Sequence, residues 1–184
     1  MDDTSKKSFF EIIKFALTII LIVVPIRTFV AQPFIVNGES MSPTFENGEY
    51  LIIDELSYHL RTPQRGEVVV FRYPKDPSKF FIKRIIGLPG ETVRVRGTNI
   101  TITDPDGKLV QLDDSLASYT NSTWSTNVRT ELGPEEYFVM GDNRNRSLDS
   151  RSWGPVEENL IKGRVLVRLF PFTNVSYLPG HLTK

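Results

Sequence analysis

The sequence predicts a compact, mainly β domain of mostly antiparallel sheets, preceded by one N-terminal transmembrane helix. Two features of the sequence support this fold class. Residues 9–30 form the only strongly apolar stretch, and from Phe34 onward short β-branched or aromatic runs alternate with Gly, Pro, Asn or Asp. A chain of 184 residues suits one domain with an appendage. We therefore expect a tail over 1–8, a transmembrane anchor over 9–30 and the β domain over 31–184.

The apolar stretch has charged residues near both ends. Its uncharged centre runs only over 15–26, which is shorter than the about 20 residues of a spanning helix, but Lys14 and Arg27 can snorkel and extend it. Two alternatives are a buried amphipathic helix and a cleavable signal peptide, which Arg27 and the bulky Phe29 disfavour. Three lysines before the centre, against one arginine after it, favour a cytoplasmic tail over 1–8. The β domain then lies on the trans side of the membrane.

Short runs with the composition of strands follow the apolar stretch. They are 50–53, 67–73, 80–86, 92–95, 99–103, 135–140 and 164–170. Residues 104–107 (Asp-Pro-Asp-Gly) predict a turn, because proline presets φ and glycine accepts a positive φ. The polar region near 104–131 otherwise lacks a strand pattern, and we expect an irregular insertion with little bearing on chemistry.

A candidate nucleophile lies directly after the apolar stretch. Ser40 stands in the run Asn-Gly-Glu-Ser-Met-Ser-Pro-Thr-Phe at 37–45. A serine is a weak nucleophile and needs a base to take its proton. The chain has no cysteine, and neither His59 nor His181 lies in a segment with the features of a site. The candidate base is therefore a lysine.

Lys83 is embedded in an apolar strand over 80–86. Because side chains alternate along a strand, Phe81, Lys83 and Ile85 share one face, and Arg84 lies on the other. At least one of the two cations must then have apolar neighbours. Burial disfavours the charged ammonium and lowers the pKa of a lysine toward neutrality. The alternative is a solvated edge strand on which both cations reach water.

The segment 141–154 is too polar for a core and too varied for a linker. Its charged residues can form hydrogen-bonded pairs that fix a loop, with hydroxyl groups as short-range partners. These residues are Asp142, Arg144, Arg146, Ser147, Asp149, Ser150 and Arg151. The alternative is a solvated surface turn, which is the usual structure of Asp/Asn/Ser/Gly clusters.

Composition excludes several classes of function. The 22 basic and 22 acidic residues give no net charge, which argues against nucleic acid as a partner. The lack of cysteine excludes disulfides, thiolate metal sites and a cysteine protease. The two histidines lie far apart, and no phosphate-binding or dinucleotide-binding motif occurs. We expect neither a cofactor nor a metal.

Together these stretches resemble type I signal peptidases, the membrane-bound serine proteases with a serine/lysine dyad that remove signal peptides from exported proteins. The resembling segments occur in the family's order. They are 38–44 (Gly-Glu-Ser-Met-Ser-Pro-Thr), 65–71 (Arg-Gly-Glu-Val-Val-Val-Phe), 81–90 (Phe-Ile-Lys-Arg-Ile-Ile-Gly-Leu-Pro-Gly) and 141–154. Four motifs in order after a membrane segment make the resemblance specific.

The resemblance implies a role for each of these polar residues. Ser40 would be the nucleophile and Lys83 the general base, and Ser147 would hold the lysine amine in place. Two pairs would brace the catalytic groups: Asp142 with Arg84, and Asp149 with Arg151.

The sequence departs from the family's pattern at two places. Some members have a serine at the position of Gly38, whose hydroxyl helps to form the oxyanion hole. Glycine leaves that hole to backbone N–H groups, chiefly that of Ser40. The last motif commonly has Asp-Asn where this chain has Asn145 and Arg146, which changes the local charge of the loop.

The resemblance implies a membrane-bound serine endopeptidase that cleaves N-terminal signal peptides from exported preproteins. Its partners would be those signal peptides and the lipid bilayer. It would be a single-pass protein of the cell membrane, or of an internal thylakoid-type membrane, with 31–184 as the catalytic domain. A self-cleaving repressor of the related serine/lysine kind would need a helix-turn-helix in place of 9–30. The alternative from another class is a membrane-anchored, non-catalytic β domain that binds peptides or envelope components.

Overall fold

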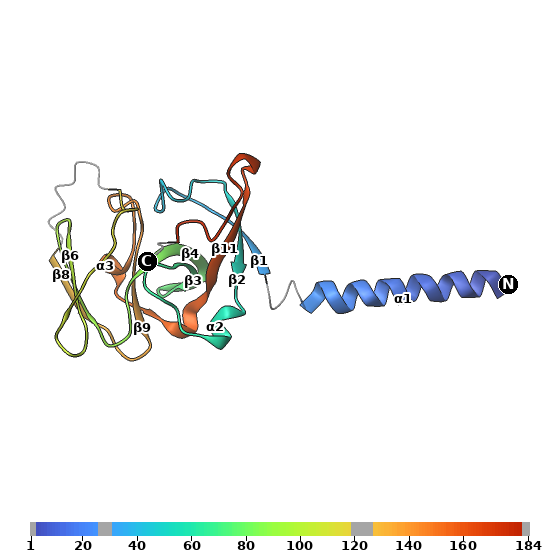
Figure 1. Ribbon diagram of the computed structural model, residues 1–184, viewed down its shortest axis with the longest axis horizontal. Helices are drawn as coiled ribbons and strands as arrows, with labels where there is room; N and C mark the ends of the chain where they lie inside the picture. The colour runs from blue at the N-terminus through green and yellow to red at the C-terminus, as the bar shows by residue number, and fades with distance from the viewer. Residues whose placement is uncertain (1–2, 26–30, 119–126, 182–184) are drawn as a thin grey trace.

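The computed structural model describes residues 3–25, 31–118 and 127–181. It begins with helix α1 (Asp3–Pro25), which extends away from the β elements in Figure 1. Every side chain from Phe9 to Leu21 is exposed. Across the three described ranges, no helix is both long and apolar enough to cross a membrane. Residues 26–30 of the predicted anchor lie outside the described residues.

The larger sheet of the described chain contains eight strands, with the order β1-β2-β11-β3-β4-β9-β10 and with β12 paired to β11. All its ladders are antiparallel. Its strands are β1 (Ala31–Ile35), β2 (Tyr50–Asp54), β3 (Val68–Tyr73), β4 (Asp76–Gly87), β9 (Glu136–Met140), β10 (Val156–Glu157), β11 (Ile161–Phe170) and β12 (Ser176–Tyr177). The predicted mainly β, antiparallel fold is confirmed.

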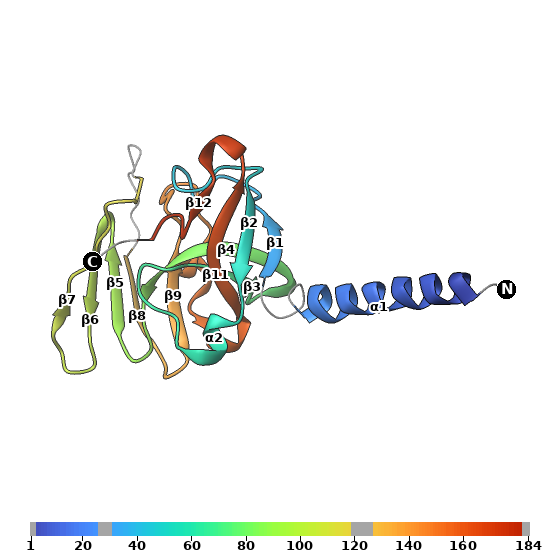
Figure 2. The same cartoon turned by 45° about the vertical axis from the view of Figure 1, so that its right-hand side comes forward.

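A smaller antiparallel sheet has the order β7-β6-β5-β8 among the described residues. Its strands are β5 (Thr92–Arg96), β6 (Asn99–Thr103), β7 (Leu109–Val110) and β8 (Asn127–Glu131). Figures 1 and 2 both show this sheet on the side of the body opposite β1 and β2. The predicted turn is present, since the Gly107 N–H donates to the Asp104 carbonyl oxygen (3.0 Å) and Gly107 has a φ of 83°.

Strands β7 and β8 differ from the irregular insertion expected near 104–131. Strand β8 pairs with β5 along its whole length, from Thr92 opposite Glu131 to Arg96 opposite Asn127. Its side chains alternate between exposed and half-buried, and none is fully buried. A strand with so little buried surface carries polar residues, so its composition is that of a loop.

Short helices complete the described chain. They are α2 (Ser57–Leu60), α3 (Ser150–Trp153) and the 3-10 helices η2 (Glu158–Leu160) and η3 (Phe172–Asn174). Helix α3 begins after Asp149, whose side chain accepts a hydrogen bond from the Arg151 backbone N–H. This N-cap fixes the end of the polar segment after β9 at the start of helix α3.

Strand alternation divides the core into neighbouring clusters. On β3, Val68 and Val70 pack with Met41 and Phe45, whereas Val69 packs in a second cluster with residues of β4 and β9. A third cluster joins β4 and β9 to the smaller sheet. Met41 and Phe45 are 1% and 0% exposed, so the segment just after Ser40 is fixed in the core.

Candidate active site

A groove of about 740 Å³ contains both Ser40 and Lys83. One wall is formed by β1 and the turn that follows it, and the other by β4 and the loop after β9. The lining residues are 33–40, Leu51, Val70, 79–83, Arg146 and Leu148. Strand β1 is an edge of the sheet, and β4 pairs with β9 only from Arg84 onward. Both walls therefore offer strand edges to an extended peptide.

Core packing and backbone hydrogen bonds hold Ser40 at the groove. The buried Met41 follows it directly, and the Phe45 N–H donates to the Met41 carbonyl oxygen (2.9 Å). The Ser40 carbonyl oxygen accepts from the Asn143 N–H (3.0 Å). Gly38 has a φ of 93°, a conformation that favours glycine. The half-buried Ser40 hydroxyl is thereby presented to the groove from a fixed turn.

The amine of Lys83 meets the Ser40 hydroxyl. Nζ lies 2.7 Å from Ser40 Oγ and 2.8 Å from the Ile82 carbonyl oxygen. It also lies 5.4 Å from the centroid of the Phe81 ring. When the amine is neutral, the hydroxyl donates to its lone pair while the amine donates to Ile82. This is the contact that a general base requires.

Burial makes Lys83 a weaker base than a free lysine. The residue is 4% exposed. Its burial lowers the pKa from 10.5 to about 8, although the negative charges of Asp149 and Asp142 act in the opposite direction. At pH 7 about a tenth of the amine is then neutral, and above pH 8 most of it is. The environment therefore prepares this lysine to accept a proton near neutrality.

Arg84, the other cation of the strand, is also buried. Its Nε and Nη2 bind the two carboxylate oxygens of Asp142 at 2.7 and 2.5 Å. Its Nη1 donates to the carbonyl oxygens of Gly66 (2.7 Å) and Gly180 (2.5 Å). Asp142 also accepts from the Thr44 hydroxyl (2.5 Å). Strand alternation predicts at least one buried cation, and the structure buries both because the guanidinium has acceptors at every side.

A second buried pair fixes the loop after β9. Arg151 binds Asp149 through Nε (2.8 Å) and Nη2 (2.9 Å), and Nη2 also donates to the Arg144 carbonyl oxygen (2.7 Å). Asp149 accepts from the Gly141 N–H (3.1 Å). The structure thus contains both ion pairs that the resemblance implies.

Ser147 makes a different hydrogen bond from the one that the resemblance implies. Its Oγ accepts from the Gly141 N–H (3.1 Å). Within the described chain, no hydrogen bond joins it to the Lys83 amine, whose bonds go to Ser40 and Ile82. A Cβ on Gly141 would overlap Ser147 Oγ and the Ser40 carbonyl oxygen. Ser147 therefore contacts the backbone that supports the site, and Gly141 allows the two loops to approach closely.

Backbone N–H groups near Ser40 differ in their availability. The Gly38 N–H donates to Asn47 Oδ1 (2.9 Å) and is already engaged. Among the hydrogen bonds of the described residues, none uses the Ser40 N–H. The Ser40 N–H thus has no hydrogen-bond partner within the described part of the chain, and its role in an oxyanion hole stays a prediction.

The segment expected to have little bearing on the site contacts it directly. Ser118 donates from its N–H to the Asp142 carbonyl oxygen (2.7 Å) and accepts from the Arg144 N–H (3.1 Å). Asp114 forms an ion pair with Arg144, whose side chain is 2% exposed. The sequence contains no signal that joins these distant residues.

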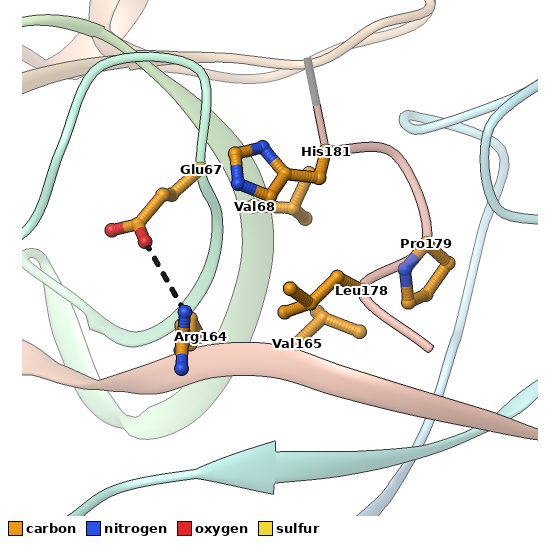
Figure 3. Close-up of a pocket in the computed structure, with 7 residues that line it drawn as sticks. All are labelled: Glu67, Val68, Arg164, Val165, Leu178, Pro179 and His181. Atoms are coloured by element: carbon orange, nitrogen blue, oxygen red, sulfur yellow. Dashed lines mark ion pairs between the residues drawn. The ribbon is translucent and has the colours of Figure 1, made fainter. Parts of the chain in front are cut away.

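A second cavity lies apart from this groove. Figure 3 shows its lining, in which the Glu67 carboxylate faces Arg164 (3.8 Å) and His181 is another lining residue. Glu67 also accepts from Tyr58 (3.0 Å) and Arg61 (2.5 Å). The cavity measures about 10 Å³, which is at most the space of one water molecule, and it shares no lining residue with the groove. The side chains around it form an ion-pair network of Glu67 with Arg61 and Arg164.

The described residues include no group of three or more His, Asp or Glu side chains arranged to hold a metal ion. The polar groups that meet in the groove are the Ser40 hydroxyl and the Lys83 amine. A serine hydroxyl beside a buried amine, between two open strand edges, is the arrangement of a serine endopeptidase.

Comparison with known proteins identifies the family. The model of the family described as signal peptidase, peptidase S26, matches residues 9–170. A probable signal peptidase I-2 of Synechocystis sp. is 39% identical over 96% of this chain and 83% of its own length. Signal peptidase I of Leptolyngbya laminosa is 37% identical over 86% of this chain and 78% of its own length. A crystal structure of a signal peptidase I from Enterococcus faecalis, 31% identical, covers 57% of this chain and 97% of its own, with a TM-score of 0.46.

The chain is therefore a serine endopeptidase, a hydrolase. It belongs to the signal peptidase family, peptidase S26.

Proposed function

We propose that the chain cleaves N-terminal signal peptides from exported preproteins, with Ser40 as nucleophile and Lys83 as general base. The observation that supports this most is the 2.7 Å separation of Lys83 Nζ and Ser40 Oγ inside a groove open to a peptide. The lowered pKa of Lys83 supports it further, because a lysine with a pKa of about 8 can take a proton at working pH.

The reaction begins with an extended peptide in the groove. Main-chain hydrogen bonds to the edges of β1 and β4 supply affinity, and pockets between them supply specificity. Ser40 Oγ attacks the scissile carbonyl carbon while its proton passes to Lys83 Nζ. The Ser40 N–H stabilises the oxyanion of the tetrahedral intermediate. The carbon–nitrogen bond then breaks, and Lys83 returns the proton to the leaving amine.

Water completes the cycle. Lys83 takes a proton from water, which attacks the acyl-enzyme ester, and the ester bond to Ser40 breaks as the lysine returns the proton to Ser40 Oγ. The Ile82 carbonyl oxygen orients the amine throughout, because it accepts one of the amine's hydrogen bonds (2.8 Å). The pairs of Asp142 with Arg84 and of Asp149 with Arg151 brace the two loops that carry this geometry.

The same proposal includes residues 9–30 as a single-pass anchor in a lipid bilayer, with 1–8 in the cytoplasm and 31–184 as the catalytic domain on the trans side. The exposed apolar side chains of α1, from Phe9 to Leu21, support it, because such a surface is stable against lipid and not against water. The membrane is the cell membrane or an internal thylakoid-type membrane. Recovery of the full chain in the soluble fraction, without detergent, would refute the anchor.

The test is cleavage of a purified preprotein by the full chain in detergent, with N-terminal sequencing of the product. We expect a single new N-terminus and no product from Ser40→Ala, since that change removes the attacking oxygen and little volume. Ser115→Ala is the matched control, because Ser115 is exposed and lies outside the groove. Substantial turnover by Ser40→Ala would remove Ser40 from the mechanism. Peptide binding without cleavage by the wild type would favour the non-catalytic alternative.

A further inference from the structure

An exposed ion pair joins the two walls of the groove beside Ser40. Glu39 precedes Ser40 on the wall formed by β1 and its turn, and Arg146 lies on the loop after β9. Arg146 Nη1 donates to Glu39 Oε2, although the two residues are 107 positions apart in the chain. The pair therefore spans the groove at its Ser40 end.

This ion pair is not needed to hold the two walls together. The Asn143 N–H already donates to the Ser40 carbonyl oxygen (3.0 Å), and the Arg146 N–H donates to the Asn143 carbonyl oxygen (3.1 Å). The side chains of Arg146 and Glu39 are 70% and 54% exposed. Exposed pairs of this kind contribute little to stability. Their charges thus remain available to a bound peptide.

The Glu39–Arg146 pair lies where the substrate residues after the cut pass out of the groove. Under the proposed function, on which this inference rests, residues before the cut fill the groove between 33–36 and 79–82. A peptide whose scissile carbonyl reaches Ser40 continues past the Ser40 end of the groove. Its first residues after the cut therefore pass Glu39 and Arg146.

The unused donors of Arg146 favour an anion at this end of the groove. The charged lining residues beside Ser40 are Arg146 and Glu39, whereas Lys79 lies on the β4 wall and pairs with Asp76 (2.8 Å). Arg146 uses one nitrogen for Glu39, and a guanidinium carries five N–H donors. An incoming carboxylate can bind Arg146 without displacing Glu39. Arg146 is also the more exposed of the two charges, with 70% of its side chain accessible against 54% for Glu39.

We propose that Arg146, oriented by Glu39, is a specificity-determining residue that selects an acidic side chain among the first residues after the cut. The ligand it recognises is the carboxylate of an Asp or Glu in the substrate. Arg146 is one of the two residues at which the last motif departs from the family's common pattern.

The test uses the full chain in detergent and a preprotein series with Asp, Asn or Lys at each of the first three positions after the cut. The readout is the ratio of kcat/KM between substrates, in which general effects on folding cancel. We expect Asp to exceed Asn by about two- to fivefold at one of these positions, the range of a single exposed ion pair. The ratio should fall toward one at high salt, because exposed charges are screened.

Variants assign the preference to Arg146. In Arg146→Gln the Asp to Asn ratio should fall to about one, and in Arg146→Glu the Lys substrate should exceed the Asn substrate. Arg129→Gln is the matched control, because Arg129 forms a similarly exposed ion pair with Glu131 on β8. This control should keep the wild-type ratio.

Equal cleavage of the Asp, Asn and Lys substrates by the wild type would overturn the inference while leaving the proposed function intact. A preference that persists in Arg146→Gln, or that Arg129→Gln also loses, would overturn it as well. If the wild type cleaves none of the substrates, the proposed function fails, and the inference fails with it.

Discussion

Replacing Lys83 by methionine should abolish activity and yet stabilise the folded protein at neutral pH. Methionine has a similar length and no charge, so it removes a buried ammonium without leaving a large cavity. A pKa of about 8 in place of 10.5 means that the protonated amine destabilises the folded state by about 3 kcal/mol at pH 7, at about 1.4 kcal/mol per pH unit. The variant should exceed the wild type in unfolding free energy by up to this amount.

The dependence on pH has a definite sign. Below pH 8, Lys83 is protonated in both the folded and the unfolded chain, and the whole cost is present. Between about pH 8 and 10.5 the folded protein loses the proton while the unfolded chain keeps it, so the cost shrinks as pH rises. The stability gap between Lys83→Met and the wild type should therefore narrow to about 1.4 kcal/mol near pH 9.5.

Urea unfolding of both proteins in the same detergent, at a series of pH values, measures this gap. Other titrating groups are common to the two proteins and cancel in the difference. The rising limb of kcat/KM against pH provides the companion measurement, and it should lie near pH 8. A stability gap that does not change between pH 7 and 9.5, or a rate that rises only around pH 10, would refute the reasoning.

Two further changes test the loop after β9. Gly141→Ala should remove activity and lower Tm, because the new Cβ would overlap Ser147 Oγ and the Ser40 carbonyl oxygen. A variant with wild-type kcat would show that the close approach of the two loops is not needed. Asp114→Asn should lower kcat and should lower the unfolding free energy by about 1.5–3 kcal/mol, because the buried Arg144 loses the negative charge of this carboxylate. Asp106→Asn is the control and should change neither quantity, because Asp106 is exposed. If urea unfolding and kcat show no difference between the two variants, Asp114 does not have this role.

The sequence predicted the strands whose side chains are fully buried. Val68, Val69 and Val70 are all buried, in two core clusters, so their run is distinctly apolar. Strand β8 buries no side chain completely, and for that reason its composition is polar. Secondary structure was therefore predictable where the core was, and not at the polar edge of the smaller sheet.

The candidate site was predictable only through its motifs. Ser40 and Lys83 are 43 residues apart, and no spacing rule brings them within 2.7 Å. The apolar neighbours of Lys83 favoured its burial but left a solvated edge strand as the alternative, and burial of Arg84 depends on acceptors from distant segments. The contacts of Asp114 and Ser118 could not be predicted from a motif. One is a single ion pair and the other a backbone bridge, and neither requires a recognisable pattern in the sequence.

The hydrogen bonds of Arg84 have a consequence for how the enzyme is made. They join segments 18, 58 and 96 positions away, at Gly66, Asp142 and Gly180. Closing loops of these lengths costs chain entropy, which the hydrogen bonds and the ion pair of Arg84 must offset. The Gly180 acceptor exists only once synthesis has reached residue 180, so a shorter nascent chain lacks one of the contacts that hold Arg84 next to Lys83.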